Sequence, residues 1–323
     1  MVLSVEDLET SFSTADGVAR AVRGVSLRVS AGETVALVGE SGSGKSVTAA
    51  SIMRLLPASA AITGGRVLLD GVDLCALDRR ALRRIRGRRI AMVFQDSMTA
   101  LNPVITIGRQ MTEGLSTHLG IRGPAARERA ADLLREVGVP EPEQRLRQYP
   151  HQLSGGLRQR IAVAMALAAD PELLIADEPT TALDVTVQAQ LLDLLRRERE
   201  RRGMGMILIT HDLGIVAGMA DRVCVMYAGR IVEQGPTEAV FAAPRHPYTA
   251  GLLRSIPRID STIAGRLPSI EGLPPSPWAL PAGCPFSPRC EHVEERCRAD
   301  EPAPQPVGPA YVAACWRAER AGA

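Results

Sequence analysis

The chain has 323 residues, enough for one large domain with an appended segment or for two modest domains. A hydrophobic share of 46% suits a globular core, but no apolar run reaches the roughly 18–20 residues that would span a bilayer. A net charge of +2 and an aromatic share of 3% argue against a nucleic-acid-binding protein, which would carry a basic stripe or aromatic side chains for base stacking.

Predicted strands and helices alternate along most of the chain. Residues 34–39 form a buried strand that runs into a glycine-rich loop, and residues 46–56 have the apolar spacing of a helix. After another buried strand at 89–94, β-branched runs become rare, which predicts a helical subdomain over about residues 97–165. The alternation then resumes, so we expect an α/β fold with a mainly parallel sheet.

The sequence GESGSGKS at residues 39–46 fits the phosphate-binding pattern G-x-x-x-x-G-K-[ST]. Glycines in such a loop let backbone N–H groups turn toward a phosphate at the start of the next helix. Lys45 is the only lysine among 38 basic residues, and its compact ammonium fits between two phosphates where a planar guanidinium would not. The expected nucleotide-binding residues of this loop are Gly39, Ser41, Gly42, Gly44, Lys45 and Ser46, the last as a Mg²⁺ ligand.

A pair of carboxylates follows a second buried strand. The stretch LLIADEP (173–179) places Asp177 and Glu178 at the carboxyl end of that strand, where α/β folds bind their ligands. We expect Asp177 to hold Mg²⁺ through water. We expect Glu178 to orient or deprotonate the attacking water.

A helix start with two glycines precedes that strand. In QLSGGLRQR (152–160), Ser154 is placed to cap a helix that begins with Gly155 and Gly156. The positive end of this helix predicts a second anion site, which is unusual in a chain that already has a phosphate loop.

The composition changes from about residue 257, where proline and glycine dominate. We therefore predict one domain over residues 1–256 and a small cysteine-rich extension over 257–323. In a reducing cytosol its four cysteines indicate a metal site rather than disulfides. Their spacing lacks both the close pair of structural zinc sites and the ferredoxin patterns, so zinc and an iron–sulfur cluster stay open. These four residues are Cys284, Cys290, Cys297 and Cys315.

Taken together, GESGSGKS, LSGGLRQR and LLIADEP resemble an ABC-type ATPase. The resemblance implies a dimer in which the LSGG segment of one subunit closes over ATP held by the phosphate loop of the other. It also implies that Gln95 contacts Mg²⁺ and the attacking water, that Asp184 lies at the dimer seam and that His211 contacts the γ-phosphate. Phe12 resembles the aromatic residue that stacks on adenine, with a core phenylalanine as the alternative. Leu157 departs from the glutamine of many members.

Longer stretches resemble the ATPase subunits of bacterial dipeptide, oligopeptide and nickel importers. They are QDSMTALNPVITIG (95–108), PTTALDVTVQAQ (179–190), HPYTAGLLRSIP (246–257) and GCPFSPRC (283–290). The resemblance implies a peripheral protein at the cytoplasmic face of the membrane. Its partners would be two permeases, a second and often different ATPase subunit and an extracytoplasmic substrate-binding protein, with no nucleic acid. The alternative is a soluble ABC ATPase that acts on nucleic acid or ribosomes.

The same resemblance favours a [4Fe–4S] cluster on the four cysteines. Zinc is the second choice and an empty, reduced site the third. A redox sensor that regulates uptake is an alternative role for this extension.

Overall fold

The computed structural model describes residues 1–95, 100–181, 183–256 and 269–319. The chain divides into two compact units. The first comprises Met1–Val2, Val29–Glu33 and Ala76–Ile209, and the second comprises Leu3–Arg28, Thr34–Cys75 and Thr210–Ala323. The expected boundary at residue 257 lies outside the described residues.

Three parallel strands and several helices form the first unit. Strand β7 (Leu173–Asp177) pairs with β6 (Ile90–Val93) on one side and with β8 (Gly205–Ile209) on the other. Both β7 and β8 are buried along their whole length, which agrees with their unbroken apolar sequences. The helices of this unit are α2 (Arg79–Ile85), α4 (Ile107–Leu119), α5 (Gly123–Glu136), α6 (Pro142–Arg145), α7 (Gly155–Leu167) and α8 (Val185–Arg202).

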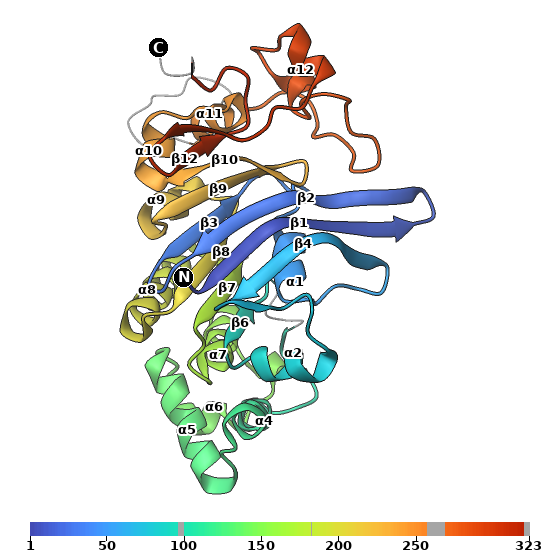
Figure 1. Cartoon of the computed structure of the whole chain (residues 1–323). Helices are drawn as coiled ribbons and strands as arrows, with labels where there is room; N and C mark the ends of the chain where they lie inside the picture. Colours follow the sequence, from blue (N-terminus) through green and yellow to red (C-terminus); the bar gives the residue numbers. More distant parts are fainter. Residues whose placement is uncertain (96–99, 182, 257–268, 320–323) are drawn as a thin grey trace. The chain divides into compact units, whose positions relative to one another are not determined.

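Helices α4, α5 and α6 occupy the stretch predicted to be helical and are drawn in green in Figure 1. Apolar residues at helical spacing explain them: Met111 and Leu115 are buried on α4, and Ala130 and Leu134 on α5. Most of the remaining surface of both helices is polar, although Leu119 of α4 and Ala125 of α5 are exposed.

Two sheet portions form the second unit. One is antiparallel with the order β2-β1-β4-β5, and its long blue strands β1 and β2 run side by side in Figure 1. The other contains β3, which pairs in parallel with β9, while β10, β12 and β11 follow in antiparallel pairs. The strands are β1 (Leu3–Thr14), β2 (Gly17–Val29), β3 (Thr34–Val38), β4 (Ala60–Leu69), β5 (Val72–Asp73), β9 (Arg222–Tyr227), β10 (Arg230–Pro236), β11 (Gln305–Gly308) and β12 (Tyr311–Ala313).

Part of the C-terminal extension therefore continues a sheet that begins near the phosphate loop. Strand β12 pairs with β10 through Glu233 and Ala313. Phe286 and Tyr311 of the extension share one buried cluster with Tyr227 and Tyr248. The helical elements of this unit are α1 (Lys45–Ile52), α9 (Leu213–Met219), α10 (Thr237–Ala242), α11 (Pro247–Arg254), the 3₁₀ turn η2 (Ser287–Arg289) and α12 (Glu295–Ala299).

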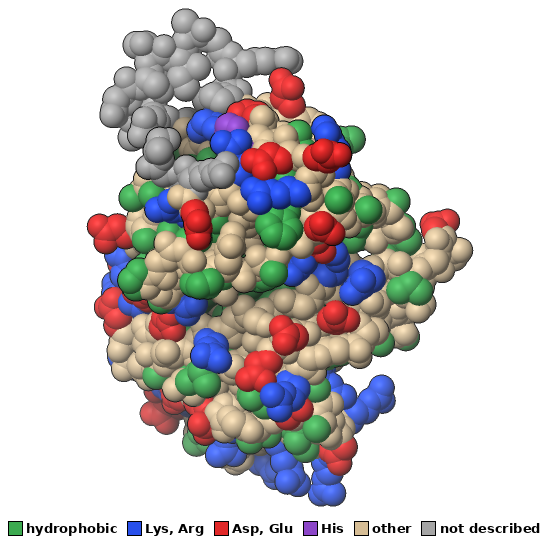
Figure 2. Space-filling view, turned by 45° about the horizontal axis from the view of Figure 1, so that its top comes forward, with side chains coloured by type: hydrophobic (Ala, Val, Ile, Leu, Met, Phe, Trp, Pro, Cys, Tyr) green, Lys and Arg blue, Asp and Glu red, His purple; other side chains and the backbone are tan. Residues whose placement is uncertain are grey.

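Basic and acidic side chains are interspersed over much of the face shown in Figure 2. Across the four described stretches, no helix is both long and apolar enough to cross a bilayer.

Candidate active site

The phosphate loop lies between buried strand β3 and helix α1. Gly39 has φ 150° and Gly44 has φ 106°, both in the region that favours glycine. A Cβ atom on Gly39 would lie 2.2 Å from the Met226 carbonyl oxygen, and one on Gly44 would lie 2.6 Å from that of Ala21. Close backbone contacts therefore require glycine at both fixed positions of the motif.

Lys45 opens helix α1 and is buried. Its ammonium donates to the carbonyl oxygen of Gly39 at 2.8 Å and to that of Glu40 at 2.9 Å. Helix α1 has neither a side-chain cap nor an acidic residue in its first turn, so its first N–H groups face no competing carboxylate of their own helix. A tight glycine cradle, a buried ammonium and an uncapped helix start fit the phosphates of ATP. Ser46 is the second residue of this helix, and Ser41 and Gly42 lie in the loop.

Two other predicted nucleotide contacts lie in the same unit. Phe12 is half-buried on β1 opposite Ala60. His211 is exposed and directly precedes Asp212, whose side chain caps α9 by accepting from the backbone N–H groups of Gly214 and Ile215. This capping fixes the backbone next to the histidine.

Gln95 and Glu178 meet in the first unit. The Gln95 amide donates to a Glu178 carboxylate oxygen at 2.9 Å, although 83 residues separate them. The hydroxyl of Thr181 donates to the same carboxylate at 3.0 Å. Glu178 has φ 44°, an uncommon conformation for this residue type that is often found at functional sites. Asp177 is buried at the end of β7.

Sequence reasoning missed Thr181. A hydroxyl three residues after a predicted catalytic carboxylate was the available signal, because such a spacing lets the side chain fold back in a turn. The backbone N–H of Thr181 also donates to the Glu178 carbonyl oxygen at 3.2 Å.

The LSGG segment and Asp184 begin two linked helices. The Ser154 hydroxyl caps α7 by accepting from the Leu157 N–H at 3.4 Å, and Gly155 and Gly156 are the first two residues of that helix. Asp184 caps α8 by accepting from the Val187 N–H at 3.0 Å. Arg160 of α7 donates to Gln190 of α8 at 2.8 Å, which links the two helices just beyond their first turns. The start of α7, capped by an uncharged serine and with no acidic residue in its first turn, can face an anion, whereas the start of α8 already carries the Asp184 carboxylate.

All four C-terminal cysteines line one small cavity of about 20 Å³, together with His246 and Phe286. None of them forms a disulfide. Burial raises the pKa of the Cys284 thiol to about 11, and it also raises the pKa of Cys290 and Cys315. A metal that bound here would have to displace the protons of these thiols, because metals bind the thiolate.

The fit of a metal to this cavity is poor. In the described part of the chain, no three His, Cys, Asp or Glu side chains lie close enough together to hold a metal ion. A cavity of about 20 Å³ accommodates one water molecule and not a four-iron cluster. The predicted convergence of the cysteines is present, but in this structure the four thiols are not close enough together to form a ligand set without rearranging. His292 also lines the cavity.

Two family models match the chain. The model described as ABC transporter matches residues 22–181, and the model described as oligopeptide/dipeptide transporter, C-terminal region, matches residues 232–297. The dipeptide transport ATP-binding protein DppD of Bacillus subtilis is 51% identical, over 99% of this chain and 97% of its own length. A putative peptide import ATP-binding protein of Brucella abortus is 53% identical, over 98% of this chain and 97% of its own length.

Solved structures share the fold. The dimeric ATP-binding cassette MJ0796, in a post-hydrolysis state with ADP and phosphate, is 29% identical with a TM-score of 0.66. The match covers 73% of this chain and 98% of the cassette. The cbiO1 protein of Clostridium perfringens, part of an ABC transporter complex, is 30% identical with a TM-score of 0.62, over 75% of this chain and 90% of its own. The predicted α/β fold of an ABC-type ATPase is confirmed, and the chain belongs to the ABC transporter family as one of its ATP-hydrolysing subunits.

Proposed function

We propose that this chain hydrolyses ATP to drive the import of short peptides through partner permeases. The observation that carries the proposal is the match of residues 232–297 to the oligopeptide/dipeptide transporter C-terminal region, alongside the ATPase match. Proteins named for dipeptide transport and peptide import share about half of its residues over nearly the whole length. A related cargo such as a nickel chelate is the alternative within the same class.

The phosphate loop would hold the nucleotide. Gly39, Gly44 and the N-terminus of α1 supply backbone groups, and Lys45 exchanges its bonds to loop carbonyls for bonds to the β- and γ-phosphates. Mg²⁺, when bound, neutralises charge that develops on the phosphates. Its proposed ligands are Ser46, Asp177 and Gln95.

Glu178 would act on the attacking water. Its carboxylate accepts hydrogen bonds from Gln95 and Thr181 on one oxygen, which fixes the direction of the group that would accept a proton from water. His211 would contact the γ-phosphate and Phe12 the adenine. The LSGG segment of a second subunit would complete the site on this chain's phosphate loop. The LSGG segment of this chain, whose helix Ser154 caps, would complete the site of the second subunit, and Asp184 would lie at the seam.

The proposed assembly contains two permeases, a second and different ATPase subunit and an extracytoplasmic substrate-binding protein. The chain would sit peripherally at the cytoplasmic face of the membrane, since the permeases supply the membrane-spanning part. Nucleic acid has no role in this assembly.

A tagged pull-down of the full chain from membranes in mild detergent tests this proposal. Two permeases and a second ATPase should co-purify, and binding of a dipeptide rather than a nickel chelate by the associated binding protein would identify the cargo class. Recovery with ribosomes or DNA alone would contradict the importer and support the soluble alternative.

We propose that the four cysteines take a [4Fe–4S] cluster, with zinc as the alternative. Their convergence on one cavity supports this, while the small cavity requires the thiols to rearrange and lose their protons first. Anaerobically purified protein should absorb near 400 nm and contain about four irons per chain. Colourless protein with one zinc per chain, or with no metal at all, would refute the cluster.

A further inference from the structure

The second residue of the phosphate loop is held by side chains from far along the chain. Glu40 accepts two parallel hydrogen bonds from Arg289, at 2.6 Å from Nη1 to Oε2 and at 2.9 Å from Nη2 to Oε1. Its backbone N–H donates to the Tyr248 hydroxyl at 2.8 Å. A paired fork of this kind fixes the direction of the carboxylate as well as its distance.

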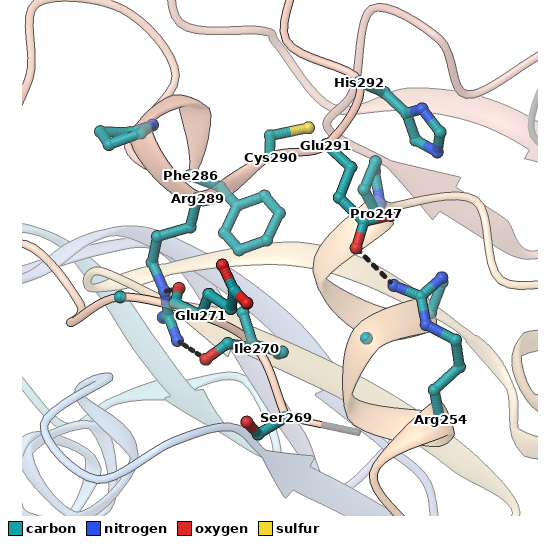
Figure 3. Close-up of a pocket in the computed structure, with 14 residues that line it drawn as sticks. Pro247, Arg254, Ser269, Ile270, Glu271, Phe286, Arg289, Cys290, Glu291 and His292 are labelled. Carbon is teal, nitrogen blue, oxygen red and sulfur yellow. Dashed lines mark hydrogen bonds and ion pairs between the residues drawn. The ribbon is translucent and has the colours of Figure 1, made fainter. Parts of the chain in front are cut away.

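Arg289 is itself held rigidly at the end of turn η2. Its side chain is only 4% exposed. The guanidinium also donates to the carbonyl oxygen of Glu271 at 2.9 Å, to that of Ile270 at 3.3 Å and to the Tyr227 hydroxyl at 3.3 Å. Figure 3 shows this side chain on the opposite side of the pocket from the Arg254–Glu291 pair.

Charge and packing both keep the guanidinium in place. Hydrogen bonds to the Glu40 carboxylate raise the pKa of Arg289, so the group is charged throughout the physiological range. The Cζ atom of Arg289 lies 5.8 Å from the centre of the Tyr227 ring and 6.0 Å from the centre of the Phe286 ring. A guanidinium over aromatic rings gains a cation–π attraction. A lysine ammonium could also gain this attraction, but it could not form the two parallel hydrogen bonds to the Glu40 carboxylate.

The opposite end of Glu40 contacts the proposed phosphate ligand. Its carbonyl oxygen accepts from the Lys45 ammonium at 2.9 Å. Glu40 therefore contacts both Arg289 of the C-terminal extension and Lys45, the only lysine of the chain. The arginine also compensates a carboxylate that would otherwise repel the nearby phosphates of a nucleotide.

We infer that Arg289 is a positioning residue for ATP binding: it pairs with Glu40 and so holds the phosphate loop in its binding shape. This inference rests on the proposed binding of ATP phosphates at that loop. Arg289 lies beside Cys290 in the extension, so the extension contributes directly to the nucleotide site of its own chain. The contribution is to affinity, since Arg289 touches no catalytic group.

The full-length chain tests the inference through nucleotide affinity and ATPase kinetics. Arg289→Ala should raise the Kd of a fluorescent ATP analogue and the KM for ATP about tenfold, with kcat changed by less than about twofold, because it removes ground-state binding. Arg289→Lys should give an intermediate loss, since an ammonium cannot form the fork. Arg254→Ala is the matched control, because Arg254 lines the same pocket but pairs with Glu291, and it should leave both constants unchanged.

A double variant separates pairing from general loosening of the extension. Glu40→Gln alone should weaken nucleotide binding, and Arg289→Ala should add little to that loss in the Glu40→Gln background, because the pair is already broken. Losses that simply add in the double variant would overturn the inference, as would wild-type affinity in Arg289→Ala. Should Arg289→Ala fail to fold, the comparison of Arg289→Lys with and without Glu40→Gln applies the same criterion.

Lys45→Ala distinguishes this inference from the proposed site. Loss of nucleotide binding in Lys45→Ala, with unchanged binding in Arg289→Ala, would refute only the role of Arg289. Unchanged binding in Lys45→Ala would instead refute the placement of the phosphates.

Discussion

The phosphate loop and the cysteine cavity lie in the same unit, and they differ in how much each must rearrange before it can bind its proposed ligand. In the loop, Lys45 is charged, buried and bonded to carbonyl oxygens that phosphates can replace. In the cavity, the four cysteines are gathered, burial raises the pKa of Cys284, Cys290 and Cys315, and the positions of the thiols do not form a ligand set. The loop is therefore preorganised, so a nucleotide can bind without the free-energy cost of a large rearrangement. A metal, by contrast, would first have to displace the thiol protons and widen the cavity.

The variant with the largest expected effect on turnover changes Glu178, and it tests whether the catalytic groups are preorganised like the phosphate loop. Glu178→Gln should bind ATP with near-normal affinity and reduce turnover at least about 100-fold, because the amide cannot accept a proton from water. Gel filtration with ATP should show a trapped dimer. Near-normal hydrolysis would show that the carboxylate bonded to Gln95 is not the group that acts on water.

The cavity should reveal itself through slow thiol chemistry. In metal-free, reduced protein at pH 8, a pKa of about 11 should make alkylation of Cys284 about 100-fold slower than that of an ordinary thiol. The rate, followed by peptide mass spectrometry, should rise about tenfold per pH unit up to pH 11. An ordinary rate at pH 8 would mean that the thiolate is already formed, which would remove the contrast with the loop.

His246, in the wall of the cavity, should make stability depend on pH. Burial lowers its pKa to about 4, and its neutral Nδ1 accepts from the Tyr248 N–H at 3.0 Å. Since the unfolded state binds a proton more readily, the free energy of unfolding should fall by about 2 kcal/mol between pH 7 and pH 5 through this group.

The neighbouring Glu233 acts in the opposite direction. Burial raises the pKa of Glu233, whose carboxylate accepts from the backbone N–H of His246. The free energy of unfolding that this carboxyl contributes therefore increases as pH falls. Urea titrations of wild type and His246→Asn at both pH values isolate the histidine, because Glu233 is common to both. An equal pH dependence in the two proteins would show that the histidine is solvated and the cavity open.

Thr181 should have the smallest effect. Thr181→Val removes one hydrogen bond to the Glu178 carboxylate and should lower kcat about fivefold, equivalent to about 1 kcal/mol. Thr181→Ser keeps the hydroxyl and should retain wild-type kcat. If both variants behave alike, the packing of the side chain rather than its hydroxyl supports the carboxylate.

The sequence motif at residues 39–46 was enough to predict the phosphate loop and the elements on either side of it. The glycines of the loop, Lys45 and the strand before them follow from chain-local geometry, and the backbone contacts at Gly39 explain why the motif has this form. The ABC-type α/β fold was predicted from the motifs and is confirmed by the related cassettes. The hydrogen bond from Gln95 to Glu178 joins residues that follow the ends of β6 and β7, and it could be expected only through the family resemblance.

Long-range contacts and protonation were beyond local patterns. Arg289 is one arginine among 37 in the sequence, and nothing near it signals a partner 249 residues away. The raised pKa values of Cys284 and Cys290 depend on their burial against the cluster that contains Phe286, and the spacing of the cysteines in the sequence does not reveal this burial. Domain boundaries and the roles of individual site residues stay predictions.

The separation of Glu40 from Arg289 has a consequence for the newly made protein. A chain emerging from the ribosome at roughly 5–20 residues per second exposes the phosphate loop well before the arginine that braces it. The delay over these 249 residues is therefore roughly 10–50 s, during which the loop lacks its bracing and binds nucleotide weakly. A truncated product that ended before Arg289 would lack the pair with Glu40 and would therefore hold nucleotide less tightly than the chain that contains the arginine.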